Sequence, residues 1–395
     1  MPVLNRSQLS DLRGATRMVV DAAEATADVV EKMHRTIQLR PGPLGEFVSG
    51  RTRGITGMVY RGVRGGIRLV GQAIDASLAP VTFLLPEGGP TPAQDAYKSV
   101  LNGLCGDYLF RTGNPLAIDM SLRFKGRPVN LHDPESSLNQ HTDTKASRTK
   151  LLVLVHGLCM NERHWNREGH DHGAALADDL GYLPLYLRYN SGLEISANGR
   201  ELAALLETLV GNWAHRVEEI TLVGHSMGGL VARSACHQGR IAGHAWLQHL
   251  RKLVFLGTPH HGAPLERGGR GLEFVMNLSP YSKPLIHISQ VRSAGITDLR
   301  HGRIAPMQPI VPLPAGVQCY AAAAVRAKKR SILAERLVGD GLVPLNSALG
   351  RHRDASRKLA IPKSRQWVGY RIGHAELLNH PSVYSRINRW LRQAA

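Results

Sequence analysis

Aromatic residues, paired cysteines and long apolar runs are all scarce in this sequence. Aromatic side chains make up 5% of its 395 residues, which is too few for the stacking platforms that bind single-stranded nucleic acids. No stretch of about 18 residues is apolar and free of charge, so the pattern predicts no membrane-spanning helix. The first residues also lack the apolar segment of a signal peptide. We therefore expect a cytoplasmic protein.

The four cysteines lie far apart and form no C-x-x-C pair, so neither a zinc site nor a redox motif is indicated. They are Cys105, Cys159, Cys236 and Cys319. Reduced thiols of this kind fit the cytoplasm, where disulfides are rare. The histidine groups at 170–172 and 260–261 lack the H-E-x-x-H spacing of a zinc hydrolase. We expect no metal and no cofactor.

Positive charge is in excess. The chain has 49 lysines and arginines against 31 acidic residues, which gives a net charge of +18. Such a balance favours nucleic acid or an anionic membrane as a partner. The basic residues are scattered along the whole chain without a dense block, and we therefore expect no nucleic-acid partner.

Residues 1–110 read as a helical N-terminal region. Apolar residues recur every three or four positions from 15 to 39 and again from 54 to 78, which predicts two helices. On the second helix, Arg61, Arg64 and Arg68 fall on one face. A separate face carries the apolar residues Val59, Val63, Ile67, Val70 and Ile74. Two interpretations stay open: an appendage packed on the main domain, or a basic segment in peripheral contact with anionic lipid.

Residues 111–395 show alternating strand and helix patterns. After a hairpin at 118–131, apolar runs predict strands at 151–155, 183–189, 220–223, 253–256, 317–324 and 366–372. Helices are expected at 173–180, from a capping box of Asn198 and Glu201, at 227–237 and at the C-terminus. Repeated β-α-β units build a mostly parallel sheet with helices on both faces. The fold class is therefore α/β.

The stretch from about 260 to 315 is too long and too rich in glycine and proline for an ordinary connection. It carries apolar side chains that favour a partner over water, namely Phe274, Val275, Met276, Leu278, Tyr281, Leu285 and Ile286. It follows one predicted strand and precedes the next. We expect a lid-like insertion over the carboxyl ends of the strands.

The motif Gly224-His225-Ser226-Met227-Gly228 fits G-x-S-x-G. It follows a predicted strand and opens a predicted helix, which is the arrangement of a nucleophile elbow. The glycines leave room where side chains would collide with the crossing strand and helix. This context predicts that Ser226 is a nucleophile, whereas a bare glycine-rich turn would have no such flanks.

A serine nucleophile needs a base and an orienting acid, which follow it along the chain in that type of sheet. Asp340 lies beyond the strand at 317–324, between two glycines that let its loop fold back. Asp298 is the rival, but it precedes that strand. For the base, His374 follows the last strand and precedes the C-terminal helix. His380 is placed to cap that helix, and His352 lies among basic residues in a predicted surface loop.

An oxyanion hole needs two backbone N–H donors aimed at the developing charge. One is expected from Met227, directly after the nucleophile. The other is expected from Leu158, in the turn after the strand at 151–155. His156 in the same turn suits a supporting hydrogen bond better than a metal.

Five motifs carry a family resemblance: Leu154-Val-His-Gly-Leu158, Val223-Gly-His-Ser-Met-Gly-Gly-Leu230, Leu256-Gly-Thr-Pro-His-His-Gly-Ala-Pro264, Gly339-Asp-Gly-Leu-Val-Pro344 and His374-Ala-Glu-Leu-Leu378. From about residue 116 onward, the chain resembles the α/β-hydrolase superfamily. More narrowly, it is similar to the lipase-like proteins grouped with the GPI inositol-deacylase family. The resemblance implies an α/β-hydrolase fold and a serine esterase or lipase with Ser226, Asp340 and His374 as its triad.

The sequence as a whole predicts a serine carboxylic-ester hydrolase that acts on a small-molecule or lipid ester with an apolar acyl group. A thioesterase or an acyltransferase is the alternative among enzymes, because both form the same acyl-enzyme. An interaction scaffold on a hydrolase fold is the alternative outside enzymes.

Overall fold

A computed structural model describes residues 5–39, 52, 54–84, 89–139, 148–213, 216–263, 293–306, 311–327 and 339–393. The chain forms two compact units. The first comprises Met1–Pro92 and Arg111–Leu116, and the second comprises Ala93–Phe110 and Ala117–Ala395. The helix α3 (Pro92–Arg111) thus belongs almost entirely to the second unit, although the sequence places residues up to 110 in the N-terminal region.

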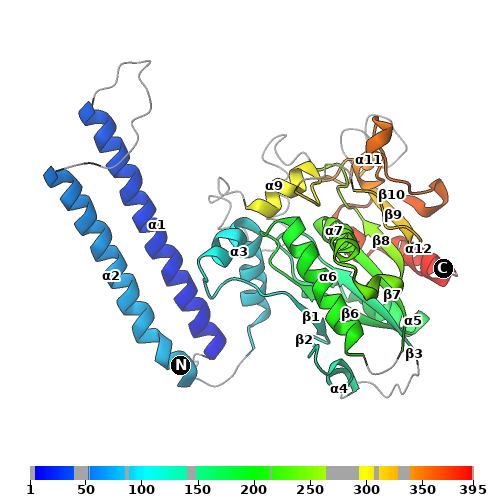
Figure 1. Cartoon of the computed structure of the whole chain (residues 1–395). Helices are drawn as coiled ribbons and strands as arrows, with labels where there is room; N and C mark the ends of the chain where they lie inside the picture. Colours follow the sequence, from blue (N-terminus) through cyan, green and yellow to red (C-terminus); the bar gives the residue numbers. More distant parts are fainter. Residues whose placement is uncertain are drawn as a thin grey trace. The chain divides into compact units, whose positions relative to one another are not determined.

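Two long helices make up most of the first unit. They are α1 (Arg6–Leu39) and α2 (Gly54–Leu84), and they run antiparallel, side by side (Figure 1). Both predicted helices are confirmed, with α1 beginning nine residues earlier than expected and α2 ending six residues later. Among the described residues, no helix combines the length and the apolar character that crossing a bilayer requires.

An eight-stranded sheet forms the centre of the second unit, in the order β10-β9-β8-β7-β3-β6-β1-β2. Its parallel strands are β3 (Arg148–Val155), β6 (Tyr182–Arg188), β7 (Arg216–His225), β8 (Leu250–Leu256), β9 (Gln318–Val325) and β10 (Gln366–Tyr370). The predicted hairpin, β1 (Ser121–Phe124) and β2 (Arg127–Pro128), adds two antiparallel strands at one edge. A separate small ribbon pairs β4 (Asn166–Arg167) with β5 (His170–Asp171).

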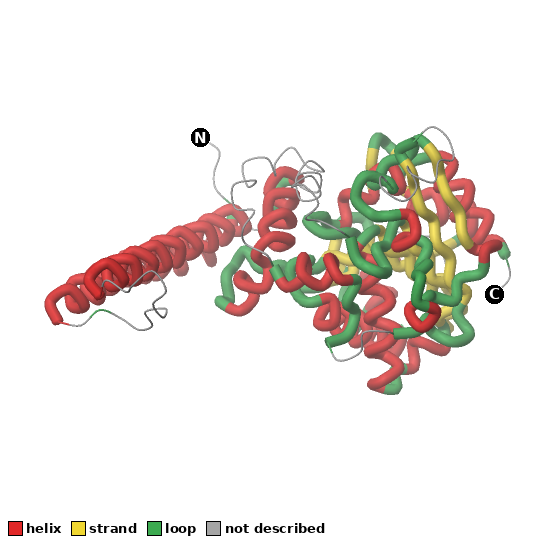
Figure 2. The backbone as a smooth tube through the Cα atoms, turned by 90° about the horizontal axis from the view of Figure 1, so that it is seen from above, coloured by secondary structure: helices red, strands yellow, loops and turns green. Residues whose placement is uncertain are grey.

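Helices cover both faces of this sheet, as predicted (Figure 1, Figure 2). One face packs on α5 (His172–Leu180) and α12 (Pro381–Arg392), and their apolar side chains form one cluster with alternate residues of the central strands. The other face packs on α6 (Ile195–Gly211) and α7 (Met227–Ala242). Because both faces are covered, Leu151 to Val155 of β3 are fully buried, which explains their continuous apolar run.

The expected capping box at Asn198 is wrong. The helix α6 begins at Ile195, so Asn198 lies inside it, and its side-chain amide donates to the carbonyl of Asn190 at 3.0 Å. The N–H of Ile195 donates instead to the Asp298 carboxylate at 3.0 Å. A residue about one hundred positions away therefore performs the capping that the local sequence was expected to provide.

The shorter helices are α4 (Pro134–Asn139), α9 (Ala294–His301) and α11 (Leu345–Ala348). Of the expected insertion at 260–315, residues 264–292 and 307–310 lie outside the described residues. The apolar side chains between 274 and 286, on which the lid prediction depends, are among them. The described parts of this stretch are residues 260–263, 293–306 and 311–315, which include α9.

A buried ionic network fixes α3 against the sheet of the second unit. Arg188 on β6 donates to both oxygens of Asp95 on α3, at 2.9 and 3.0 Å, and to Glu162 at 2.6 and 2.7 Å. Arg163 donates to Asp95 at 2.9 Å. The Asp95 side chain is 2% exposed, so its charge depends on these partners.

We expect Asp95→Ala to lower the free energy of unfolding by about 3 kcal/mol, because it leaves Arg188 partly buried with one anionic partner fewer. Denaturant titration followed by tryptophan fluorescence measures this change. The matched control is Asp178→Ala on the exposed side of α5, for which the change should stay within about 0.5 kcal/mol. Equal losses in the two variants would contradict the role assigned to the network.

Candidate active site

Ser226 occupies the sharp turn between β7 and α7. Its backbone angles are φ 53° and ψ −125°, a strained conformation for a residue with a side chain. The N–H of Ser226 donates to the carbonyl of Leu256 at 2.8 Å. Ser226 stands at the N-cap position of α7 without using its hydroxyl as a cap. The turn therefore presents this hydroxyl at the carboxyl edge of the sheet.

The glycines on either side of the turn are required by close packing. A Cβ atom on Gly228 would lie 2.1 Å from the carbonyl oxygen of Val155, and one on Gly224 would lie 2.4 Å from Cα of Gly229. Neither position has room for any side chain. The steric reason predicted for the G-x-S-x-G spacing is thus confirmed.

Asp340 and His374 meet at the same edge of the sheet, from the loops that follow β9 and β10. His374 Nδ1 donates to Asp340 Oδ2 at 2.7 Å, and both side chains are 1% exposed. The other carboxylate oxygen accepts the N–H groups of Leu342 and Val343 at 3.0 and 2.8 Å. Every neighbour of this carboxylate is a donor, so its orientation is fixed.

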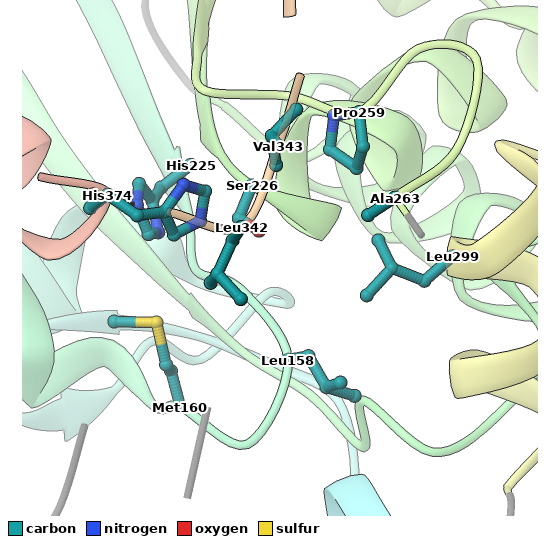
Figure 3. Close-up of a pocket in the computed structure, with 10 residues that line it drawn as sticks. All are labelled: Leu158, Met160, His225, Ser226, Pro259, Ala263, Leu299, Leu342, Val343 and His374. Atoms are coloured by element: carbon teal, nitrogen blue, oxygen red, sulfur yellow. Dashed lines mark hydrogen bonds between the residues drawn. The ribbon is translucent and has the colours of Figure 1, made fainter. Parts of the chain in front are cut away.

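The remaining ring nitrogen of His374 is directed to the same pocket as Ser226. Because Nδ1 carries the proton that Asp340 accepts, Nε2 is the nitrogen with the free lone pair. Within the described part of the chain, this buried Nε2 atom has no hydrogen-bond partner. His374 and Ser226 both line the pocket in Figure 3. A base with an available lone pair and a serine thus line the same pocket.

His225 contributes to this arrangement in a way that the motif alone did not suggest. Its Nε2 atom donates to the backbone carbonyl of His374 at 3.1 Å, and the two rings lie 4.7 Å apart. Burial holds the pKa of His225 well below its ordinary value, so the ring is neutral and adds no charge beside the base. The only sequence signal was its place immediately before Ser226.

The two groups predicted for anion binding near Ser226 lie in the turn after β3 and at the start of α7. Leu158 follows β3, and Met227 is the first residue of α7, whose N–H has no acceptor within the helix. His156 Nδ1 donates to the carbonyl of Gly157 at 2.9 Å, and its ring stacks on Tyr189 at 4.3 Å. Burial lowers the pKa of His156 to about 3, so a neutral ring stabilises the turn.

The alternative residues have other partners. Asp298 accepts the N–H of Ile195, and burial raises its pKa. His380 caps α12 by accepting the N–H of Ser382 at 3.2 Å, as predicted. The His352 ring lies 4.9 Å from that of His261. None of these interactions involves Asp340 or His374.

The rest of the pocket is mostly apolar. Side chains from several loops surround the space beside Ser226 (Figure 3). They are Leu158, Met160, Pro259, Ala263, Leu299, Leu342 and Val343. Leu299 comes from α9, so the described part of the expected insertion does contribute to the site.

The histidine groups considered for metal binding are hydrogen-bonded or packed. His170 Nε2 lies 2.8 Å from His172 Nδ1. The other ring nitrogen of His172, Nε2, donates to the carbonyl of Leu377. The ring of His260 packs edge-on against Phe255 at 4.5 Å. Within the described ranges, no group of three or more His, Cys, Asp or Glu side chains is placed to hold a metal ion.

Solved structures that match part of this chain include a lipase, an esterase and a phospholipase. A lipase of Bacillus licheniformis, BlEst2 in its mature form, is 19% identical over 69% of this chain and 98% of its own, with a TM-score of 0.44. An esterase of Pyrococcus furiosus is 15% identical over 62% and 82% of the two chains, with a TM-score of 0.37. The phospholipase PlaB of Legionella pneumophila is 13% identical over 62% and 61%, with a TM-score of 0.39.

No curated protein matches the sequence. A family description does match it: residues 150–317 fit the PGAP1-like alpha/beta domain. This segment runs from the third residue of β3 to the residue before β9 and contains both the nucleophile turn and the turn after β3. The match agrees with the strand order and with the motifs of the sequence. Residues 150–317 thus match the PGAP1-like alpha/beta domain, and the second unit that contains them is an α/β fold with a mostly parallel central sheet.

Proposed function

We propose that this chain is a serine carboxylic-ester hydrolase that acts on esters with an apolar acyl group. The family match and the fold support a hydrolase. The observation that carries the finer proposal is the 2.7 Å hydrogen bond between His374 and Asp340, which leaves His374 Nε2 available in the pocket of Ser226. A strained serine, a base and a fixed carboxylate are the groups that acyl transfer to serine needs.

In the proposed reaction, Ser226 Oγ attacks the carbonyl carbon of the ester, and its proton passes to His374 Nε2. Asp340 stabilises the imidazolium that forms, and the N–H groups of Leu158 and Met227 bind the oxyanion. The ester C–O bond then breaks, and the alcohol leaves with the proton from His374. Water, deprotonated by the same nitrogen, attacks the acyl-enzyme, releases the acid and restores Ser226.

The apolar lining supports an apolar acyl group. Seven of the ten lining side chains carry no polar group, and a buried hydrocarbon chain gains about 0.8 kcal/mol for each CH₂ group removed from water. Binding to such a wall favours the acyl chain over a charged or strongly hydrated substrate. The neutral ring of His225 also adds no charge to this side of the pocket.

Ser226→Ala should abolish hydrolysis of p-nitrophenyl esters and labelling by a fluorophosphonate probe, because it removes the only atom that bonds to the acyl group. The measurements are steady-state rates and mass spectrometry of the labelled protein. Circular dichroism should show an unchanged fold. If the variant is still labelled, the nucleophile is another residue, and if the wild type is not labelled, the interaction scaffold becomes the better interpretation.

Asp340→Asn should lower kcat by about 10⁴-fold, the loss known for the equivalent change in a serine protease, because the amide no longer holds the His374 ring in the productive tautomer. The matched variant is Asp298→Asn, which changes the same group at the N-terminus of α6 and should leave kcat within a few-fold of wild type. The acid is assigned wrongly if Asp298→Asn causes the larger loss in kcat at comparable stability.

A further inference from the structure

The interface between α1 and α2 is charged, which is unusual for two packed helices. Three groups of ion pairs join the helices: Arg13 and Arg17 with Asp75, Arg64 with Asp28 and Glu31, and Arg68 with Glu24. Where their distances are given, they lie between 2.6 and 3.0 Å. Helices that pack in water normally place apolar residues at this position. Ion pairs therefore join the two helices along their contact.

Arg64 shows most clearly how these charges are held. Its side chain is 5% exposed and lies between Asp28, at 2.8 Å, and Glu31. Glu31 also accepts the N–H and hydroxyl of Thr52, at 3.0 and 2.5 Å. These bonds, first from Thr52 and then from Arg64, lower the pKa of Glu31 to about 2. The Arg64–Glu31 pair is thus ionised, and Arg64 Nη1 bonds both carboxylates within the unit.

This arrangement reduces the free basic charge that the sequence places on α2. Arg61, Arg64 and Arg68 were expected to share a face that could contact anionic lipid. Arg64 is buried against Asp28 and Glu31, and Arg68 pairs with Glu24 at 2.7 Å. Of the three arginines, Arg61 alone is both exposed and outside these ion pairs. Basic charge on α2 is therefore largely neutralised.

The apolar side chains of the same helices point away from this interface. Twelve large ones are between 39% and 79% exposed: Leu12, Val19, Val29, Val30, Met33, Ile55, Met58, Val59, Val63, Leu69, Val70 and Ile74. In the described part of the second unit, only three large apolar residues are similarly exposed, Tyr97, Phe110 and Ile241. The apolar exposure is thus concentrated on one pair of helices.

Both helices expose apolar residues on the side opposite the ion pairs. On α1, Val19 and Met33 are 68% and 60% exposed, and on α2, Leu69 and Val70 are 69% and 59% exposed. A protein partner packed on one helix would cover one of these outer faces and leave the other in water. An apolar solvent would contact both. Paired charges inside and apolar residues outside are the arrangement that helices adopt in lipid.

Close approach of the two helices fits the same environment. Gly71 faces α1 so closely that a Cβ atom would lie 2.7 Å from the side chain of Val20. Small residues at helix contacts are typical of association in lipid, where packing rather than the hydrophobic effect holds helices together. Among the described charged residues of α1 and α2, those exposed as whole residues are Asp21, Lys32, Arg61 and Arg68.

We propose that the pair of helices α1 and α2 is a membrane-contact element whose outer apolar faces enter the apolar region of a lipid bilayer from one side. Contact of this kind depends on buried apolar area rather than on lipid charge. It therefore holds the chain at vesicles of zwitterionic lipid and persists at high salt. The proposal concerns location at a lipid surface and is independent of the proposed ester hydrolysis.

Flotation of the full-length protein with phosphatidylcholine vesicles tests this directly. Wild type should float with the vesicles in low and in high salt. Leu69→Glu on α2 and Val19→Glu on α1 should each lower the partition coefficient between vesicles and water by about tenfold or more. Each variant removes an apolar side chain that the proposal places in lipid, and it adds a charge there. Activity on a soluble short-chain ester serves as a separate readout and should not change in either variant.

Two control variants separate apolar from electrostatic contact. Ile241→Glu makes the same type of change at a side chain that is 64% exposed on α7, and it should leave vesicle binding unaltered. Arg61→Gln should also leave binding to phosphatidylcholine unaltered. Charge attraction would instead restrict binding to vesicles that contain anionic phosphatidylglycerol. That binding would be lost at high salt and in Arg61→Gln but kept in Leu69→Glu, and this result would overturn the proposal.

A second copy of the chain is the competing occupant of these faces. Sedimentation velocity over a range of concentrations, without lipid, measures self-association. A concentration-dependent dimer that Val19→Glu disrupts, together with no binding to any vesicle, would overturn the membrane proposal. Absence of both dimer and vesicle binding would overturn it as well.

Discussion

The backbone turn at Ser226 is the constraint on which the rest of the second unit depends. The turn holds a residue with a side chain at positive φ, and it persists because β3, β7 and α7 are packed too closely for any other path. The carbonyl of Val155 lies where a side chain on residue 228 would begin. The order of the central strands then brings the loops after β9 and β10 to the same edge, where Asp340 and His374 meet.

Neutral buried histidines surround this turn and give the site a particular electrostatic character. Burial lowers the pKa of both His156 and His225, so the two rings act through single N–H donors rather than through charge. One ring stabilises the turn after β3, and the other holds the backbone of His374. Positive charge can thus form on His374 during the proposed reaction without a cationic neighbour on either of these two rings.

The sheet and the arrangement of the site could be predicted because they follow from local patterns and chain order. Continuous apolar runs identified the buried strands, and the strand and helix that flank Ser226 gave the motif its meaning. The start of α6 could not be predicted, because its capping group, Asp298, is distant in sequence. The role of His225 also depends on a contact with a residue 149 positions away. Periodicity separated the two faces of α2 correctly, but it could not show that the charged face meets another helix.

The position of Asp298 beside Leu299 has a consequence for how the shape of the pocket can change. Asp298 fastens α9 to the start of α6, while the next residue forms part of the pocket wall. The residue that anchors α9 and the residue that lines the pocket are therefore neighbours in the chain but make separate contacts. Exchange of Leu299 for a smaller or larger apolar residue can reshape the space for an acyl chain while the helix that carries it stays anchored. Position 299 can therefore change by a single substitution that leaves the Asp298 hydrogen bond in place.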